Sequence, residues 1–184
     1  MLTTEKKRIR DTIKKKRASL TTNEHKQLSK RLSQKLITLP IIQEAHIILG
    51  YSSVQKEPDL TYFYEHCLDH NKQLAFPRSE ENGAYHFAGV SDLGSDLTKG
   101  GFGVLEPTNT CFLLEPEMMP NERVIMLVPG LAFDKEGYRL GYGKGIYDGL
   151  LRTYPAYSIG IGYAFQHVDE LPRDPWDQRL SLVF

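Results

Sequence analysis

The apolar run from Val124 to Val128 (VIMLV) restricts the fold of this chain more than any other feature of its sequence. It is continuous and rich in β-branched residues, a pattern typical of a strand buried inside a sheet. Runs of the same kind stand at 46–51 (HIILGY) and 157–163 (YSIGIGY), and residues 180–184 supply a further late strand. Helical patterns separate these runs. Strands that alternate with helices predict an α/β fold: an open sheet, mostly parallel at its centre, with helices on both faces in a Rossmann-like three-layer arrangement.

Three helices are expected in the first part of the chain. Residues 4–18 place apolar residues on one side and basic residues around the rest. Thr21 followed by Glu24 is a capping-box pattern, which predicts a second helix over about residues 22–38. A third helix is expected over about residues 57–70, opened by a Glu-Pro pair, because proline is tolerated in a first helical turn.

The sequence of residues 73–120 predicts a hairpin followed by a long connection. Residues 73–76 look like a strand that Pro77 closes, and Asn82-Gly83 is a strong hairpin signal before a returning strand at 85–90. Residues 91–120 are rich in Gly, Pro, Asp and Thr, and we expect them to be irregular. An irregular stretch of that length inside a compact domain is often functional.

The composition is that of one ordinary soluble domain. The chain has 184 residues, of which 40% are hydrophobic, and shows no repeat or linker, so we expect a single domain over residues 1–184. Its two cysteines form no framework and suggest a reducing compartment. No apolar run approaches the roughly 20 residues of a membrane helix, and the N-terminus is charged from Glu5 onward, unlike a signal peptide. We therefore expect a cytoplasmic protein that does not bind membranes.

The charge is zero overall but unevenly placed. Residues 1–20 hold eight Lys and Arg residues against two acidic ones, so the rest of the chain is acidic. A cationic segment on an acidic body favours a polyanionic ligand near that segment. A charge run taken alone is more often a solvated helix face, and that alternative stays open here.

The glycine-rich segment Arg139–Asp148 (RLGYGKGIYD) carries the most chemistry. It follows a buried strand and opens a helix expected over 146–153, so its glycines can turn backbone amides toward a phosphate at a helix N-terminus. Arg139 and Lys144 add full positive charges, and Asp148 is a hard oxygen ligand suited to magnesium. The spacing matches neither a Walker loop nor a dinucleotide fingerprint. A glycine-rich turn with its charges in solvent remains the alternative.

Residues 128–150 (VPGLAFDKEGYRLGYGKGIYDGL) resemble the signature segment of the 5-formyltetrahydrofolate cyclo-ligase family. Further similarities lie along nearly the full chain. They comprise the basic start Lys6-Lys7-Arg8-Ile9-Arg10, Glu57 after a strand, Phe76-Pro77-Arg78, Gly103–Pro107 (GVLEP), Gln166 and Pro172–Asp177.

The resemblance implies an enzyme that uses ATP and Mg²⁺ to cyclise 5-formyltetrahydrofolate to 5,10-methenyltetrahydrofolate, releasing ADP and phosphate. It assigns the catalytic work on the phosphates to Lys6, Arg10, Arg139 and Lys144. The nucleotide would contact Lys6, Arg10, Arg139, Gly141, Tyr142, Gly143, Lys144, Gly145, Ile146 and Tyr147. The folate would contact Ser52, Glu57, Phe102 and Tyr142, and Asp148 would hold the metal, since the sequence offers it no other evident partner. Residues 14–17 are expected to form a solvated face.

The sequence also departs from the family pattern. Ile146 stands where an aromatic residue is usual, Tyr142 replaces the arginine of some members, and Ser181 occupies the place of a tail aspartate. Two other readings remain open: a non-catalytic sensor of a phosphate ligand, and a nucleic-acid-binding protein using its basic helix. The absence of interleaved aromatic residues argues against the second. We expect a monomer that binds small molecules and no nucleic acid.

Overall fold

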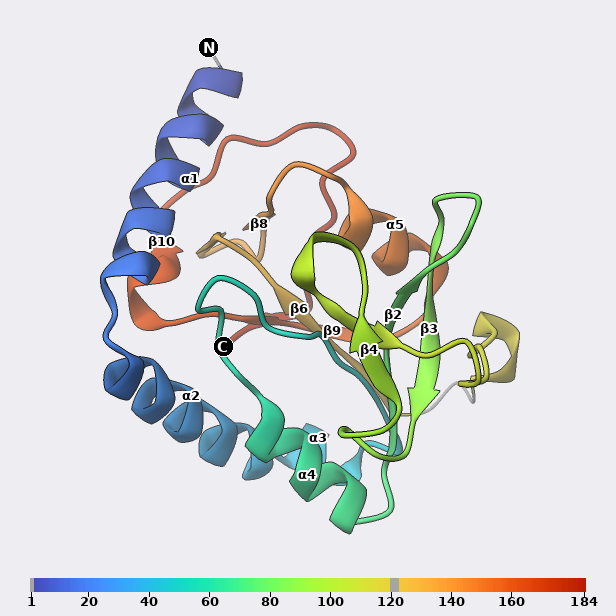
Figure 1. Cartoon of the computed structure of the whole chain (residues 1–184). Helices are drawn as coiled ribbons and strands as arrows, with labels where there is room; N and C mark the ends of the chain where they lie inside the picture. The colour runs from blue at the N-terminus through green and yellow to red at the C-terminus, as the bar shows by residue number, and fades with distance from the viewer. Residues whose placement is uncertain (1, 120–122) are drawn as a thin grey trace.

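A six-stranded sheet forms the centre of the protein (Figure 1). The computed structural model describes residues 2–119 and 123–184, except for the side chains of residues 2, 102 and 118. The strand order is β11-β9-β6-β1-β2-β3, and all neighbours are parallel except β2 and β3, which form the expected hairpin. The strands are β1 (Ile47–Leu49), β2 (Gln73–Ser79), β3 (Tyr85–Val90), β6 (Val124–Pro129), β9 (Tyr157–Ile161) and β11 (Leu182–Val183). The predicted α/β fold with a parallel centre is confirmed.

Helices cover both faces of this sheet. Along β6, Ile125 and Leu127 pack into one apolar cluster with three helices, while Met126 and Val128 pack into another with a fourth helix. This alternation buries both faces of the strand, which explains its continuous apolar sequence. The three helices on the first face are α2 (Thr22–Ile37), α3 (Pro40–Glu44) and α4 (Thr61–Asp69), and the helix on the second face is α5 (Ile146–Thr153). The three-layer arrangement predicted from the sequence is therefore present.

The N-terminal helix α1 (Leu2–Ser19) lies outside these layers, at the edge of a small second sheet (Figure 1). That sheet has the order β10-β7-β8 and consists of β7 (Ala132–Asp134), β8 (Arg139–Leu140) and β10 (His167–Val168). Ile13 of α1 packs with Leu131, Ala132 and Leu140 in a third apolar cluster. This contact places α1 beside the glycine-rich loop that follows β8. Within the described residues, neither α1 nor another helix is long and apolar enough to span a membrane.

Two expected boundaries were wrong. The helix predicted to open at residue 57 begins at Thr61, where the Asp59 carboxylate accepts hydrogen bonds from the backbone N–H and hydroxyl of Thr61. The preceding residues form a turn in which Gln55 and Lys56 have positive φ angles, incompatible with a helix. Strand β2 does not end at Pro77 but continues to residue 79. Strand β1 pairs with β2 only as far as residue 75, so Pro77 lies beyond that pairing. A proline is tolerated where a strand has lost one neighbour.

The capping box and the hairpin turn were predicted correctly. Thr21 Oγ1 accepts from the backbone N–H of Glu24, whose carboxylate in turn accepts from the backbone N–H of Thr21. Gly83 has a φ of 81°, which is the left-handed conformation that the hairpin between β2 and β3 requires.

Two buried charged residues attach the segment after β3 to the sheet. It contains the antiparallel strands β4 (Leu97–Lys99) and β5 (Leu105–Pro107), with the short helix η1 (Gly101–Gly103) between them, and later η2 (Pro116–Met118). Glu106 accepts hydrogen bonds from the backbone N–H and hydroxyl of Ser79. Arg78 donates to the carbonyls of Thr108 and Cys111, each at 3.0 Å. The Phe-Pro-Arg and Gly-Val-Leu-Glu-Pro motifs therefore hold this segment in place.

We predict that Arg78→Ala lowers the free energy of unfolding by about 1.5–3 kcal/mol, because it removes charge-assisted hydrogen bonds to two carbonyls that are partly buried. Arg31→Ala, at an exposed position of α2, is the matched control and should change it by less than about 0.5 kcal/mol. Urea denaturation of both variants measures the difference. Equal effects would show that Arg78 does not hold the segment.

Candidate functional site

The glycine-rich loop lies near the switch point of the sheet, where successive strands are added first on one side of β1 and later on the other. From β1 the chain proceeds to β2 and β3 on one side, and later to β6, β9 and β11 on the other. Open parallel sheets bind ligands beyond the carboxyl ends of the strands at such a switch point. The loop that carries Glu57 follows β1, and the connection that contains the glycine-rich loop follows its neighbour β6. The topology therefore brings two predicted site segments to one edge of the sheet.

The backbone of the loop requires glycine. Gly143 and Gly145 have φ angles of 100° and 69°, in the left-handed region, and Gly145 is the N-terminal cap of α5. A Cβ atom on Gly141 would lie 2.9 Å from Nη1 of Arg139. These conformations place the loop at the N-terminus of α5, a geometry suited to an anion.

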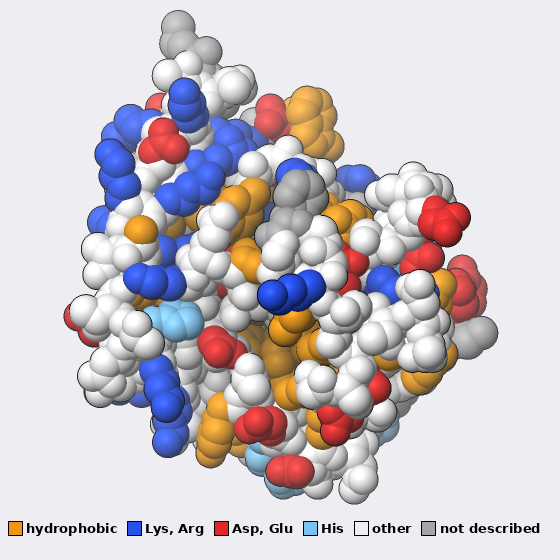
Figure 2. All heavy atoms as spheres, in the orientation of Figure 1, with side chains coloured by type: hydrophobic (Ala, Val, Ile, Leu, Met, Phe, Trp, Pro, Cys, Tyr) orange, Lys and Arg blue, Asp and Glu red, His pale blue; other side chains and the backbone are white. Residues whose placement is uncertain are grey.

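Helix α1 lies across this loop and the C-terminal segment. Lys and Arg side chains gather over α1 in the space-filling view (Figure 2). Arg10 Nε donates to the carbonyl of Gly141 at 2.9 Å. One turn earlier, Lys6 Nζ lies 2.7 Å from Asp174 and 2.9 Å from Asp177, and its side chain is only 11% exposed. Burial lowers the pKa of Lys6, but hydrogen bonds and the charges of the two carboxylates outweigh it, so the pKa is raised overall.

Asp148 has a protein partner that the sequence did not reveal. Arg139 Nη2 donates to Asp148 Oδ1 at 2.7 Å, and the arginine guanidinium lies 5.7 Å from the ring centre of Tyr147. The Arg139 side chain is 6% exposed, and its Nε is buried with no hydrogen-bond partner in the described part of the chain. Burial lowers the pKa of Arg139, although the Asp148 charge opposes this. The expectation that Asp148 lacks a partner other than a metal-bound phosphate was wrong.

Arg17 is buried, and this corrects the expectation of a solvated face over residues 14–17. Its side chain is 1% exposed; Nη1 lies 3.5 Å from Glu57 Oε1 and Nη2 donates to the hydroxyl of Tyr142. Arg17 follows Arg10 by seven residues, close to two turns of about 3.6 residues, so both point toward the same loop. That spacing is the signal that could have identified it. Lys15 and Lys16 are exposed, as expected.

Glu57 is a buried carboxylate held by its own turn and by α1. Its side chain is 3% exposed, its Oε2 accepts from the backbone N–H of Val54 at 3.2 Å, and its carbonyl lies 2.8 Å from His25 Nε2. Burial raises the pKa of Glu57, and the charge of Arg17 is the largest opposing influence. Burial and then the Glu57 charge raise the pKa of the Tyr142 hydroxyl to about 12.

The remaining predicted residues are dispersed around these two segments. Ser52 Oγ donates to the carbonyl of Leu105 at 2.6 Å and so ties the loop after β1 to β5. Phe102 belongs to η1, but its side chain lies outside the described part of the chain. Lys144 is exposed on the glycine-rich loop. Ile146 and Tyr147 begin α5 and pack partly into the core.

The acidic residues offer little for a metal ion apart from Asp148. The described residues contain no group of three His, Cys, Asp or Glu side chains arranged to hold a metal. Ser181 exchanges hydrogen bonds with Ser158 and serves to attach the C-terminal segment to β9. One carboxylate beside nucleotide phosphates fits magnesium, which keeps several waters and usually takes only one or two protein carboxylates.

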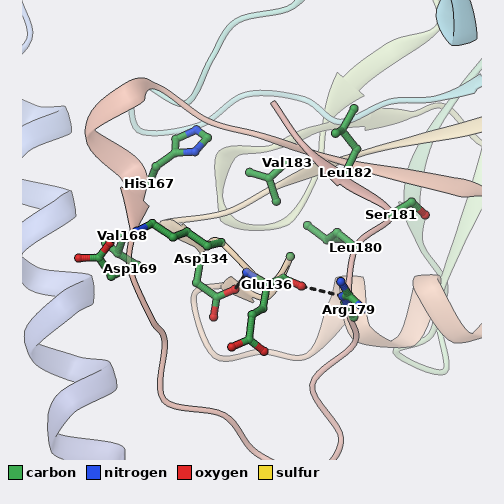
Figure 3. Close-up of a pocket in the computed structure, with 12 residues that line it drawn as sticks. Asp134, Glu136, His167, Val168, Asp169, Arg179, Leu180, Ser181, Leu182 and Val183 are labelled. Atoms are coloured by element: carbon green, nitrogen blue, oxygen red, sulfur yellow. Dashed lines mark hydrogen bonds and ion pairs between the residues drawn. The ribbon is translucent and has the colours of Figure 1, made fainter.

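A separate hollow of about 560 Å³ lies near the edge strand β11 (Figure 3). Its buried acid, Asp134, already accepts hydrogen bonds from the backbone N–H groups of Glu136, Tyr138 and Leu171. Arg179 Nε donates to the carbonyl of Glu136, as the dashed line in Figure 3 shows. These polar groups are engaged in holding the turn between β7 and β8 and the C-terminal segment, so we do not take this hollow as the candidate site.

Comparison with known proteins connects this geometry to one family. Residues 2–184 match the model of the 5-formyltetrahydrofolate cyclo-ligase family. The 5-formyltetrahydrofolate cyclo-ligases of Mycoplasma pneumoniae and Haemophilus influenzae are 32% and 30% identical to this chain, and each alignment covers at least 95% of both proteins. The solved structure of 5,10-methenyltetrahydrofolate synthetase from Aquifex aeolicus is similar with a TM-score of 0.82 and 34% identity, over 97% of this chain and 88% of that one.

We predict that Asp148→Asn lowers the free energy of unfolding by about 3–5 kcal/mol, because it leaves the buried Arg139 without a counter-charge. The double variant Arg139→Met, Asp148→Leu should recover most of this loss, since it removes both charges. Urea denaturation measures both, with Arg152→Met at an exposed position of α5 as the control. An unchanged stability of Asp148→Asn would contradict a structural role for the pair.

Proposed function

Because this chain belongs to the 5-formyltetrahydrofolate cyclo-ligase family, we propose that it cyclises 5-formyltetrahydrofolate to 5,10-methenyltetrahydrofolate in an ATP-dependent reaction. The observation that carries the proposal is the family match over residues 2–184, together with a glycine-rich loop that α1 crosses at Arg10. An enzyme of this kind must hold a triphosphate beside a flat heterocycle. The two segments at the switch point of the sheet suit these two tasks.

The reaction explains why ATP is needed. The oxygen of the N5-formyl group is a poor leaving group, and transfer of the γ-phosphoryl group of ATP to this oxygen converts it to a phosphate ester and releases ADP. N10 then attacks the formyl carbon and loses its proton, the carbon–oxygen bond breaks, and phosphate departs as the methenyl ring closes. Phosphoryl transfer depends mainly on positioning and on neutralising charge.

We assign the nucleotide phosphates to the glycine-rich loop and the adjacent cations. The amides of Gly141, Gly143 and Gly145, at the N-terminus of α5, would donate to phosphate oxygens. Arg10 already lies against this loop and would add a charge-assisted hydrogen bond. Lys144 on the loop and Lys6 beside the C-terminal segment would contribute further positive charge, with Lys6 shared between the phosphates and its two aspartates. Tyr142, Ile146 and Tyr147 complete the proposed nucleotide contacts.

Arg139 acts differently from Lys6, Arg10 and Lys144. Its guanidinium is buried against Asp148 and Tyr147 and lies close beneath Gly141. We propose that Arg139 assists phosphate binding by maintaining the conformation and the positive charge of the loop, and that it does not contact the phosphates directly.

We assign the pterin ring to Glu57 and Tyr142. A buried carboxylate can accept hydrogen bonds from the amide and amine donors of the ring, and those bonds are strongest when the carboxylate is ionised. Ser52 and Phe102 belong to neighbouring segments, and we propose that they line the same pocket.

Magnesium would be held by Asp148 together with the nucleotide and water. The ion neutralises phosphate charge when it is bound. The carboxylate already carries a charge-assisted hydrogen bond from Arg139, so we expect it to add little metal affinity in the absence of ATP.

We further propose that residues 1–184 form one cyclo-ligase-like domain that acts as a cytoplasmic monomer and binds no nucleic acid. The span of the family match supports the first part. The engagement of Lys6, Arg10 and Arg17 within the protein supports the last part, because it leaves fewer cations of α1 for a nucleic acid.

The purified protein should convert 5-formyltetrahydrofolate only when both ATP and a divalent cation are present. The measurement is the absorbance of the methenyl product, with and without excess EDTA. Ring closure that persists in EDTA would contradict the metal requirement. Binding of ATP without any conversion would indicate a phosphate-ligand sensor instead of an enzyme.

Arg10→Met should weaken ATP binding roughly tenfold or more, because it removes a charge-assisted hydrogen bond at short range. Lys15→Met removes the same charge from an exposed position of α1 and should weaken it less than about threefold, since only a screened long-range interaction is lost. Titration with ATP at moderate salt measures both dissociation constants. Equal effects would reduce α1 to a charged helix and leave the loop to hold the nucleotide alone.

A further inference from the structure

Arg17 has no contact assigned to it in the proposed reaction, yet it joins the two halves of the proposed site. We propose that Arg17 is a positioning residue whose guanidinium couples the folate-binding carboxylate of Glu57 to the nucleotide-binding loop at Tyr142. This inference rests on the proposed function, because it takes Glu57 to bind the pterin ring and the loop to bind ATP.

The contacts of Arg17 bridge the two segments. Its Nη1 faces Glu57 Oε1 at 3.5 Å, and its Nη2 donates to the Tyr142 hydroxyl. The guanidinium is planar and its donors have a fixed spacing, so it fixes the carboxylate and the hydroxyl relative to one another. A lysine carries the same charge on a single nitrogen and cannot reproduce this geometry.

The three residues come from segments that are far apart in the sequence. Arg17 is near the end of α1, Glu57 is in the loop after β1, and Tyr142 is in the glycine-rich loop. Arg10, two turns earlier on α1, donates to the carbonyl of Gly141, next to Tyr142. A shift of the glycine-rich loop is therefore passed through α1 to Glu57.

The burial of Arg17 costs free energy that a purely structural contact would avoid. Its side chain is almost completely inaccessible, and its Nε is buried without a hydrogen-bond partner among the residues that the structure describes. An unsatisfied buried donor is destabilising, and a role in the function of a site is one of the explanations for such a group. We therefore attribute the burial of Arg17 to the function of the site more than to the stability of the fold.

The charge of Arg17 also favours the ionised state of the Glu57 carboxyl. Burial disfavours the ionised carboxylate, and Arg17 is the cation whose charge opposes this most. Other titratable groups near the carboxylate include four phenols and one imidazole, those of Tyr51, Tyr142, Tyr147, Tyr163 and His25. Removing Arg17 leaves Glu57 without its main counter-charge, so the carboxyl remains protonated to a higher pH.

The first test compares folate binding across pH in Arg17→Met and Lys16→Met, which removes the same charge from an exposed neighbour on α1. Protonated Glu57 accepts poorly from the ring donors, so affinity falls as the pH falls through the pKa of Glu57. We expect Arg17→Met to move this acid limb upward by about one pH unit or more, and Lys16→Met to leave it in place. An identical acid limb in the two variants overturns the proposal.

The second test measures the coupling between the two ligands. We expect a non-hydrolysable ATP analogue to bind the wild-type protein more tightly when 5-formyltetrahydrofolate is present, and the reverse effect to be equal in size. Arg17→Lys keeps the charge but loses the bridge, so it should abolish this mutual effect while retaining the acid limb. Tyr142→Phe should abolish it as well, and adding Tyr142→Phe to Arg17→Lys should cause no further loss. Coupling that survives in Arg17→Lys overturns the bridging role.

Two further measurements separate this inference from folding and from the proposed function. Thermal melting shows whether Arg17→Met folds; if it does not, Arg17→Lys and Tyr142→Phe carry the coupling test. The ¹³C signal of the Glu57 carboxyl, assigned with Glu57→Gln, reports its titration in wild-type, Arg17→Met and Lys16→Met proteins without any turnover. If the wild type fails to close the folate ring, the proposed function falls, while this titration still decides whether Arg17 controls Glu57.

Discussion

The placement of α1 across the glycine-rich loop is the constraint on which the site depends. The helix does not belong to the three layers around the main sheet, and its apolar contact is with the small sheet through Ile13. Three of its cations then make specific contacts on one side: Lys6 with two aspartates, Arg10 with a loop carbonyl, and Arg17 with Glu57 and Tyr142. Each contact joins α1 to a segment more than thirty residues away in the chain. The helix therefore assembles the site from separate loops.

The main sheet supplies the other half of this arrangement. Neighbouring parallel strands β1 and β6 end at the same edge, and the chain leaves them in opposite directions. Connections that diverge leave room for a ligand beyond the strand ends. The Glu57 loop and the glycine-rich loop lie on either side of this space. The apolar core of the sheet supports the two loops that carry the predicted site residues.

Charged residues in this protein have two distinct uses that look alike in the sequence. Arg78 and Glu106 lie in motifs that resemble those of the family, and both hold the segment after β3 against the sheet. Arg17 lies in a run of basic residues that resembles a solvated surface, and it is among the most deeply buried side chains of the protein. A buried charge needs a partner whichever role it has, so burial alone does not distinguish them. The identity of the partners does: two backbone carbonyls and the nearby Glu80 for Arg78, and a second predicted site residue for Arg17.

The sequence by itself determined the fold class, the capping box of α2, the hairpin after β2 and the helix that opens at residue 146, because these follow from periodicity, local hydrogen bonding and the conformational needs of glycine. It also determined the family, since one long motif was specific enough. Only the tertiary structure decided that Asp148 pairs with Arg139, that Lys6 pairs with Asp174 and Asp177, and that Arg17 is buried. Apart from the Arg139–Asp148 pair, whose members are nine residues apart, these contacts join distant segments. Whether a charged side chain meets solvent or another charge depends on packing between elements, which no local pattern in the sequence encodes.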